Sequence, residues 1–148
     1  MLFGDLNESL VAVRVPATTR DEVVEFLLDL LAQTGKLTDR RLARQDVDAN
    51  EDKASFGMQH GIAIPHAKTA AVTEMIAAVC VTSAPISLDS VDGTPSRIFV
   101  MTLSPPDQVG PHIRFLSEIG RLLKNRKLRK RILEAESETE LLEILLGR

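Results

Sequence analysis

Two nearly continuous apolar runs constrain the fold of this chain more than any other feature. Residues 75–82 read MIAAVCVT and residues 97–103 read RIFVMTL. A strand with one face in water alternates apolar and polar residues, whereas runs of this kind are typical of strands covered on both faces. Pro85, Gly93 and Pro95 break the connection between the two runs. The chain must therefore lay other elements over both faces of these strands.

The first half of the chain predicts two helices and a loop. Thr19 and Glu22 form a capping box at the start of the first helix, and Gly35 ends it. The second helix is short and mostly solvated, with Leu42 as its anchor. The predicted segments are residues 20–34 and 38–47 for the helices and residues 50–60 for the loop.

The C-terminal third predicts three further helices. Phe115, Ile119 and Leu122 belong to the apolar stripe of the first, and a Ser137/Glu140 capping box opens the last. Two more strands are expected ahead of the apolar runs. The predicted segments are residues 111–124 and 126–134 for helices, the stretch after Ser137 for the last helix, and residues 10–15 and 61–64 for strands.

These segments amount to about four strands among five helices. Their order predicts an α/β fold: a single-domain sandwich over residues 1–148, with a small central sheet and helices on both faces. A chain of 148 residues suits one domain with a substantial core.

Composition excludes several classes of partner. Aromatic residues make up 3% of the chain and the net charge is −3, which argues against nucleic acid and against an anionic membrane surface. No window approaches 20 apolar residues, so no membrane insertion is expected. The single cysteine, Cys80, excludes an internal disulfide, and the N-terminus lacks a signal-peptide pattern. A cytoplasmic protein is predicted.

The stretch GIAIPHAK, residues 61–68, holds the main candidate for chemistry. Ile62–Ile64 read as a short buried strand, and Pro65 cannot donate a ladder hydrogen bond. His66 is therefore expected at the C-terminal end of a strand, where open α/β sheets bind ligands. Two interpretations stay open from spacing alone: a polar turn residue and a reactive imidazole.

His112 is the second candidate, because it opens the helix over residues 111–124 on the same stripe as Leu116. It is either a histidine that closes a helix end or a donor to an anion near that end. Three histidines also raise the question of zinc, but His60 and His66 match no common ligand spacing, so no metal site is predicted.

Other chemistries find little support. Ser55 precedes the GIAIPHAK strand, but the chain has no G-x-S-x-G elbow and no phosphate-cradling glycine loop. No cofactor is predicted. The basic run KNRKLRKR, residues 124–131, is either a solvated helix face or a rim that steers an acidic partner.

Three motifs carry a resemblance to a known family. They are G-I-A-I-P-H at residues 61–66, P-I-x-L-D-x-x-D-G-x-P at residues 85–95, and D-Q-x-x-x-H at residues 107–112. Together they resemble the enzyme IIA domain of the fructose/mannitol class in the bacterial phosphotransferase system, including its free-standing nitrogen-regulatory branch. The resemblance implies a compact α/β domain whose central sheet is mixed.

The resemblance also implies roles for residues. His66 corresponds to the histidine that accepts a phosphoryl group from the histidine-bearing phosphocarrier protein, and His112 to a second histidine that assists. The expected partners are this phosphocarrier and either an enzyme IIB domain or a regulated protein target. The family's loop carries an arginine and a Gly-Ser-Thr run. A gapless alignment puts Asn50 at the arginine and Ala54-Ser55-Phe56 at the run, so Ser55 is the expected phosphate ligand.

Two functions are therefore compared. The first is a phosphoryl carrier that accepts phosphate on His66 and passes it on or signals by its phosphorylation state. The second is a regulatory binding module of the same fold that is not phosphorylated. His66, Ser55 and His112 favour the first, while Asn50 and Phe56 favour the second.

Overall fold

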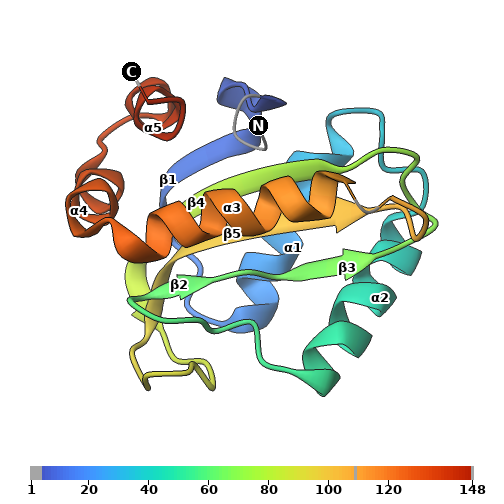
Figure 1. The fold of residues 1–148 in the computed structure, drawn as a ribbon, viewed down its shortest axis with the longest axis horizontal. Coiled ribbons are helices and arrows are strands. Elements are labelled where there is room, and N and C mark those ends of the chain that lie inside the picture. The colour runs from blue at the N-terminus through green and yellow to red at the C-terminus, as the bar shows by residue number, and fades with distance from the viewer. Residues whose placement is uncertain (1–4, 109, 148) are drawn as a thin grey trace.

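A computed structural model describes residues 5–147 except residue 109, without the side chains of residues 110–114 and 116. One open mixed sheet lies between helices on both faces (Figure 1), which confirms the predicted α/β sandwich. The strand order is β1-β4-β5-β2, and β3 also pairs with β5. β4 and β5 are antiparallel, and the other pairs are parallel. The strands are β1 (Val11–Val15), β2 (Ile62–Ala63), β3 (His66–Lys68), β4 (Ile76–Ile86) and β5 (Ser96–Ser104).

The helices cover the sheet from two sides (Figure 1). α1 crosses one face behind β4 and β5, and α3 crosses the other face in front of β5. α2 packs beside β3, α4 follows α3, and α5 packs against β1. They are α1 (Arg20–Ala32), α2 (Arg40–Lys53), α3 (Gly110–Lys124), α4 (Arg126–Glu134) and α5 (Glu138–Leu145), after a short 3₁₀ turn at Glu8–Leu10. None of the described helices has the length and apolar character needed to cross a membrane.

The apolar runs behave as predicted. Every residue of β4 from Ile76 to Thr82 is buried, and so is nearly all of β5. Cys80 sits in the middle of β4, and burial raises the pKa of its thiol to about 12. A thiol with so high a pKa forms little thiolate, so Cys80 is a core residue.

Both predicted capping boxes form. The Thr19 hydroxyl accepts a hydrogen bond from the Glu22 N–H at 3.2 Å, and the Ser137 hydroxyl accepts one from the Glu140 N–H at 3.1 Å. Such a cap satisfies one of the N–H groups that a helix start leaves without an intrahelical partner. Gly35 follows α1 with a φ of +73°, a conformation that glycine adopts without strain.

The prediction for α2 was wrong in length. The helix continues to Lys53 and so takes in the first residues of the expected loop. Residues 48–53 read DANEDK, which carries no apolar period, but a helix that is already capped by Asp39 propagates through polar residues at little cost. Leu42 is half-buried and packs against the core as predicted, and Ala43 and Val47, which the prediction did not name, are fully buried there.

The placement of His66 also needs a correction. The short strand ends at Ala63, and His66 begins a new strand, β3, rather than closing β2. Both strands run parallel to β5 along the same edge, so Pro65 divides one edge strand into two. Proline has no N–H to donate, but its carbonyl still accepts from the Thr102 N–H at 3.1 Å.

β1, at the opposite edge of the sheet, contains a bulge. Its register against β4 shifts between Ala12 and Val15, where Arg14 has a φ of +53°. The Val13 N–H donates to the Glu138 carboxylate at 2.9 Å, so α5 ties down the bulged strand. A bulge leaves a residue unpaired in the ladder, and the carboxylate satisfies it.

Candidate functional site

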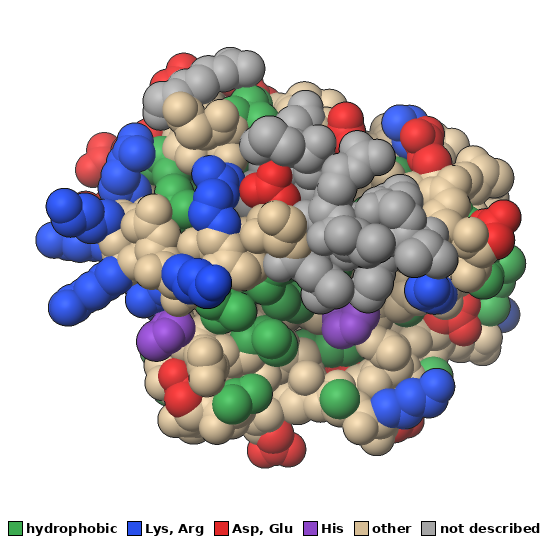
Figure 2. All heavy atoms as spheres, viewed as in Figure 1, with side chains coloured by type: hydrophobic (Ala, Val, Ile, Leu, Met, Phe, Trp, Pro, Cys, Tyr) green, Lys and Arg blue, Asp and Glu red, His purple; other side chains and the backbone are tan. Residues whose placement is uncertain are grey.

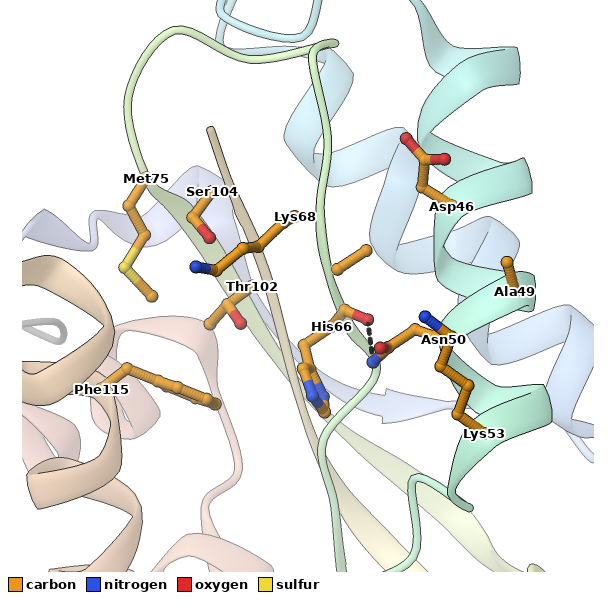
Figure 3. A pocket seen from close by; sticks show the side chains of 11 residues that line it. Asp46, Ala49, Asn50, Lys53, His66, Lys68, Met75, Thr102, Ser104 and Phe115 are labelled. Carbon is orange, nitrogen blue, oxygen red and sulfur yellow. Dashed lines mark hydrogen bonds between the residues drawn. The ribbon is translucent and has the colours of Figure 1, made fainter. Parts of the chain in front are cut away.

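His66 lines a cavity of about 410 Å³ beside the edge strand (Figure 3). α2 contributes one wall, with Asn50 and Lys53, and Phe115 of α3 contributes the other. The cavity opens where β3 and β5 end, since Lys68 and Ser104 are their last residues. This is the position at which open α/β sheets bind ligands.

A main-chain contact fixes the imidazole of His66. Its Nδ1 lies 2.6 Å from the carbonyl oxygen of Ile64. A carbonyl oxygen can only accept, so Nδ1 carries the hydrogen and the neutral ring keeps its lone pair on Nε2. Phe56 and Phe115 flank the ring, with centroids 6.1 and 6.3 Å from its own. The arrangement presents one nucleophilic nitrogen in a fixed orientation.

Asn50 supports the same residue from the side of α2. Its Nδ2 donates to the backbone carbonyl of His66 at 2.9 Å, as the dashed line in Figure 3 shows. The Asn50 amide therefore positions the main chain of β3. Asn50 also lines the cavity, at the position to which the sequence resemblance assigns an arginine.

Three polar residues that the sequence analysis did not single out share this cavity. Lys68, Thr102 and Ser104 line it together with His66. Thr102 and Ser104 reach His66 through the register of β5 against β3, two strands that are far apart in sequence. The only local signal was the spacing of Lys68, two residues after His66 on the same face of a strand.

Ser55 lies elsewhere. Its hydroxyl accepts from the Gly57 N–H at 3.2 Å, and its side chain lines a neighbouring cavity of about 630 Å³ with Arg20 and Glu51. Arg20 forms an ion pair with Glu51 at 2.5 Å and lies over the ring of Phe56. Phe56 thus separates Arg20 from His66, and the structure does not bring Ser55 into the cavity that His66 lines.

The other two histidines are His112 and His60, and His60 is not among the residues that line this cavity. The backbone of His112 lies in the first turn of α3, but its side chain is outside the described residues. His60 is exposed, has a φ of +60°, and its N–H donates to Asp92 at 3.0 Å. Among the described residues, no group of three or more His, Cys, Asp or Glu side chains is placed to hold a metal ion.

Positive charge gathers at one end of the molecule. Lys and Arg side chains cover the end that carries α4 (Figure 2), where Arg126, Lys127, Lys130 and Arg131 are exposed. Arg129 instead donates to the carbonyls of Leu122 and Leu123, which end α3. Part of the basic run therefore has a capping role, and the rest forms an exposed cationic surface.

Comparison with known families decides what kind of chain this is. A family model described as "Phosphoenolpyruvate-dependent sugar phosphotransferase system, EIIA 2" matches residues 6–147. The chain belongs to this family. As an EIIA 2 chain it has both sugar-specific and nitrogen-regulatory relatives.

Two relatives illustrate the sugar-specific and the nitrogen-regulatory members of the family. A fructose-specific EIIA component of Haloferax volcanii is 34% identical over 92% of this EIIA chain and 88% of its own length. A nitrogen regulatory protein of Pseudomonas aeruginosa is 28% identical over 90% of this chain and 87% of its own.

Solved structures of similar proteins share the fold. Nitrogen regulatory protein IIA-Ntr of Neisseria meningitidis superposes with a TM-score of 0.87, covering 97% of each chain at 24% identity. The mannitol IIA of Escherichia coli, solved in complex with phosphorylated IIB, gives 0.82 at 18% identity over 97% of this chain and 99% of that one. The EIIA architecture expected from the sequence motifs is therefore confirmed.

Proposed function

We propose that this chain is a phosphoryl carrier that accepts phosphate on Nε2 of His66. The observation that carries the proposal is the contact between Nδ1 and the Ile64 carbonyl, because it leaves Nε2 as the nucleophile at the cavity. Membership of the EIIA 2 family supports the reaction class.

Transfer of the phosphoryl group from a donor phosphohistidine to His66 requires no cofactor. The Nε2 lone pair of His66 attacks phosphorus as the N–P bond of a donor phosphohistidine breaks, and the donor nitrogen keeps the electron pair of that bond. The His66 ring becomes positively charged in the process, and its Nδ1–H continues to donate to Ile64. The carbonyl dipole stabilises that charge, so the same contact orients the ring and favours the product.

His112 and Ser55 keep their proposed supporting roles. The backbone position of His112, in the first turn of α3, and that of Phe115 against the His66 ring together favour a role for the helix start near the phosphoryl group. Ser55 lines the neighbouring cavity and not the one that His66 lines, so a role in holding phosphate requires that residues 54–56 rearrange when the donor docks.

The proposed donor is the histidine-bearing phosphocarrier protein of the phosphotransferase system. The proposed acceptor is an enzyme IIB domain, supported by the mannitol IIA solved with phosphorylated IIB. A regulated protein target is the alternative, supported by the nitrogen regulatory relative. The exposed cationic surface over α4 offers a rim that would steer an acidic partner towards the molecule.

Replacement of His66 tests the proposal. The protein is incubated with labelled phosphoenolpyruvate, the first enzyme of the system and the phosphocarrier, and its phosphate content is followed over time. Wild type and His60→Ala are expected to take up acid-labile, base-stable phosphate, and His66→Ala to take up none while keeping its circular dichroism spectrum. Undiminished labelling of His66→Ala would overturn the assignment of the acceptor.

A binding module that is not phosphorylated is the second candidate. Asn50 in place of the family's arginine favours it, because an amide cannot give a phosphoryl group the bidentate, charge-assisted contact of a guanidinium. A wild-type protein that stays unlabelled under the conditions above, yet binds the phosphocarrier, would establish this second function.

A further inference from the structure

The cavity beside His66 has a polar floor made by two adjacent strands. Within β3 and β5, His66 pairs with Thr102 and Lys68 pairs with Ser104. Side chains directly opposite each other in a parallel pair, and residues two apart in one strand, point to the same face of the sheet. All four residues line the same cavity, which therefore presents an imidazole, an ammonium group and two hydroxyls.

The three groups around His66 have unused hydrogen-bonding capacity. Over the described part of the chain, neither the Lys68 ammonium nor the hydroxyls of Thr102 and Ser104 have a hydrogen-bond or ion-pair partner. Thr102 is 3% exposed and Ser104 6% exposed. All three residues line the cavity, so the two hydroxyls and the Lys68 ammonium are available to donate hydrogen bonds to an anionic ligand bound there. Figure 3 shows the ends of Lys68, Thr102 and Ser104 converging within the cavity.

We propose that Lys68, Thr102 and Ser104 form a phosphate cradle that binds the oxygens of the phosphoryl group carried by His66. This inference rests on the proposed function and adds its binding residues. Lys68 supplies the positive charge, while the two hydroxyls donate to separate phosphoryl oxygens. The cradle thus adds the Lys68 cation from β3 to a cavity in which α2 places Lys53 and the neutral Asn50.

Ordered donors aimed at a transferring phosphoryl group lower the barrier, because its charge spreads over three oxygens. A lysine acts here as a point charge, which tolerates the movement of the group between two proteins. Cross-strand register holds the cradle, so its geometry does not depend on the conformation of residues 54–60.

The experiment measures single-turnover transfer from the phosphorylated phosphocarrier to wild type, Lys68→Met, Lys68→Arg, Thr102→Val and Ser104→Ala. Removal of one such donor typically costs about 10²-fold in rate, and we expect Lys68→Met to slow transfer by about that factor. Lys68→Arg keeps the charge and should restore most of the rate. Thr102→Val and Ser104→Ala should each slow transfer less than Lys68→Met does. The half-life of phospho-His66 should shorten in Lys68→Met, Thr102→Val and Ser104→Ala.

Two control variants make the same side-chain replacements, Lys to Met and Thr to Val, elsewhere in the chain. Lys36→Met removes an exposed lysine that pairs with Glu74, and Thr82→Val removes a buried hydroxyl that donates to Ala84, both away from the cavity. Neither should alter transfer. The cradle is wrong if Lys68→Met transfers as fast as Lys36→Met, whereas a wild-type protein that takes up no phosphate overturns the proposed function instead.

Inorganic phosphate gives a readout that does not depend on transfer. Titration of the unphosphorylated wild type should shift the amide NMR signals of residues 66–68 and 102–104, and the shifts should weaken in Lys68→Met but not in Lys36→Met. Equal shifts in both variants would overturn the cradle, even in a protein whose His66 is phosphorylated normally.

Discussion

At the scale of single residues, His66 is held through main-chain carbonyls. The Ile64 carbonyl orients the ring, and the His66 carbonyl is itself bound by Asn50. Positioning of this kind restricts the imidazole without neutralising it, because neither partner is charged. Charge at the site therefore comes from other residues, of which Lys68 and Lys53 line the cavity.

Replacement of Asn50 tests how the site responds to added charge. Asn50 lines the cavity, and the sequence resemblance assigns an arginine to its position, so Asn50→Arg should speed phosphoryl uptake or lengthen the life of phospho-His66. Asn50→Gln is the neutral control of intermediate length and should not. Rapid-quench labelling and thermal melting on the same preparations separate a kinetic effect from loss of stability. Equal kinetics for the two variants would mean that residue 50 does not face the phosphoryl group.

The sequence singles out His66, which lines the cavity, but not most of the residues that surround it there. A proline that interrupts an apolar strand just before a histidine is a local pattern, and it marks the residue without any knowledge of the fold. Thr102 lies within the apolar run of residues 97–103 and Ser104 directly follows it, so neither hydroxyl stands out in the sequence. Their meeting with His66 depends on the register of β3 against β5, which local spacing does not determine.

At the scale of elements, the two loops beside the site pack tightly together. A Cβ atom at Gly57 would lie 2.8 Å from the Cα and Cβ atoms of Ser90. The His60 N–H donates to Asp92, and a glycine with a φ of +75° follows at Gly61. The stretch that leads into β2 is therefore braced against residues 88–93 by backbone proximity.

Two glycine substitutions are expected to have opposite effects. Gly57→Ala forces the two loops apart and should lower the free energy of unfolding by about 1–3 kcal/mol, the usual cost of overpacking. Gly120→Ala, in α3, meets nothing within 4 Å and should raise it by about 0.5–1 kcal/mol through helix propensity. Urea unfolding checks both. A neutral Gly57→Ala would show that the loops separate without cost.

The helices and strands were predicted correctly where the sequence carries a helix cap or a clear apolar pattern. α1 and α5 begin at their capping boxes, and β4 and β5 match the apolar runs. It failed at the end of α2, where helix propagation through polar residues leaves no periodic signal. It also failed to divide the edge strand at Pro65, because only pairing with β5 shows that the chain resumes a ladder at His66.

At the scale of the whole molecule, ion pairs join α1 to α2. Arg44 contacts Asp21 at 2.9 Å and Asp48 at 3.1 Å, and also Glu25, while Arg40 contacts Glu25 at 2.5 Å. A hydrogen bond from Arg20 holds the pKa of Asp21 below its usual range, with Arg44 adding to the effect, and a hydrogen bond from Arg40 does the same for Glu25. Burial raises the pKa of Glu51 instead, so this carboxyl has the opposite effect on acid stability.

Acid should weaken the contact between the two helices. Because Asp21 and Glu25 bind protons less readily in the folded chain, their contribution is complete above the ordinary carboxyl pKa values of about 3.9–4.3 and is lost as pH falls below them. Solvent screens these exposed pairs, so the effect should be small and should shrink further in salt.

Urea unfolding of wild type and Arg44→Met between pH 3 and pH 7, at low and high salt, measures this contribution. The free energy of unfolding should fall less steeply with acid in Arg44→Met, and high salt should reduce the difference. Parallel curves for the two proteins at low salt would show that the network does not contribute.

At both edges of the sheet a side chain binds a main-chain group, and this limits how other chains can associate with it. A free strand edge is a template on which another strand can pair, and many proteins aggregate in this way. Here a side chain caps a main-chain group at each edge: Glu138 accepts from Val13 at β1, and Asn50 donates to His66 at β3. A bulge distorts the first edge, and Pro65 together with α2 covers the second. The sheet therefore resists growth by strand addition, and a protein that binds this chain would do so through side chains rather than by adding a strand to the sheet.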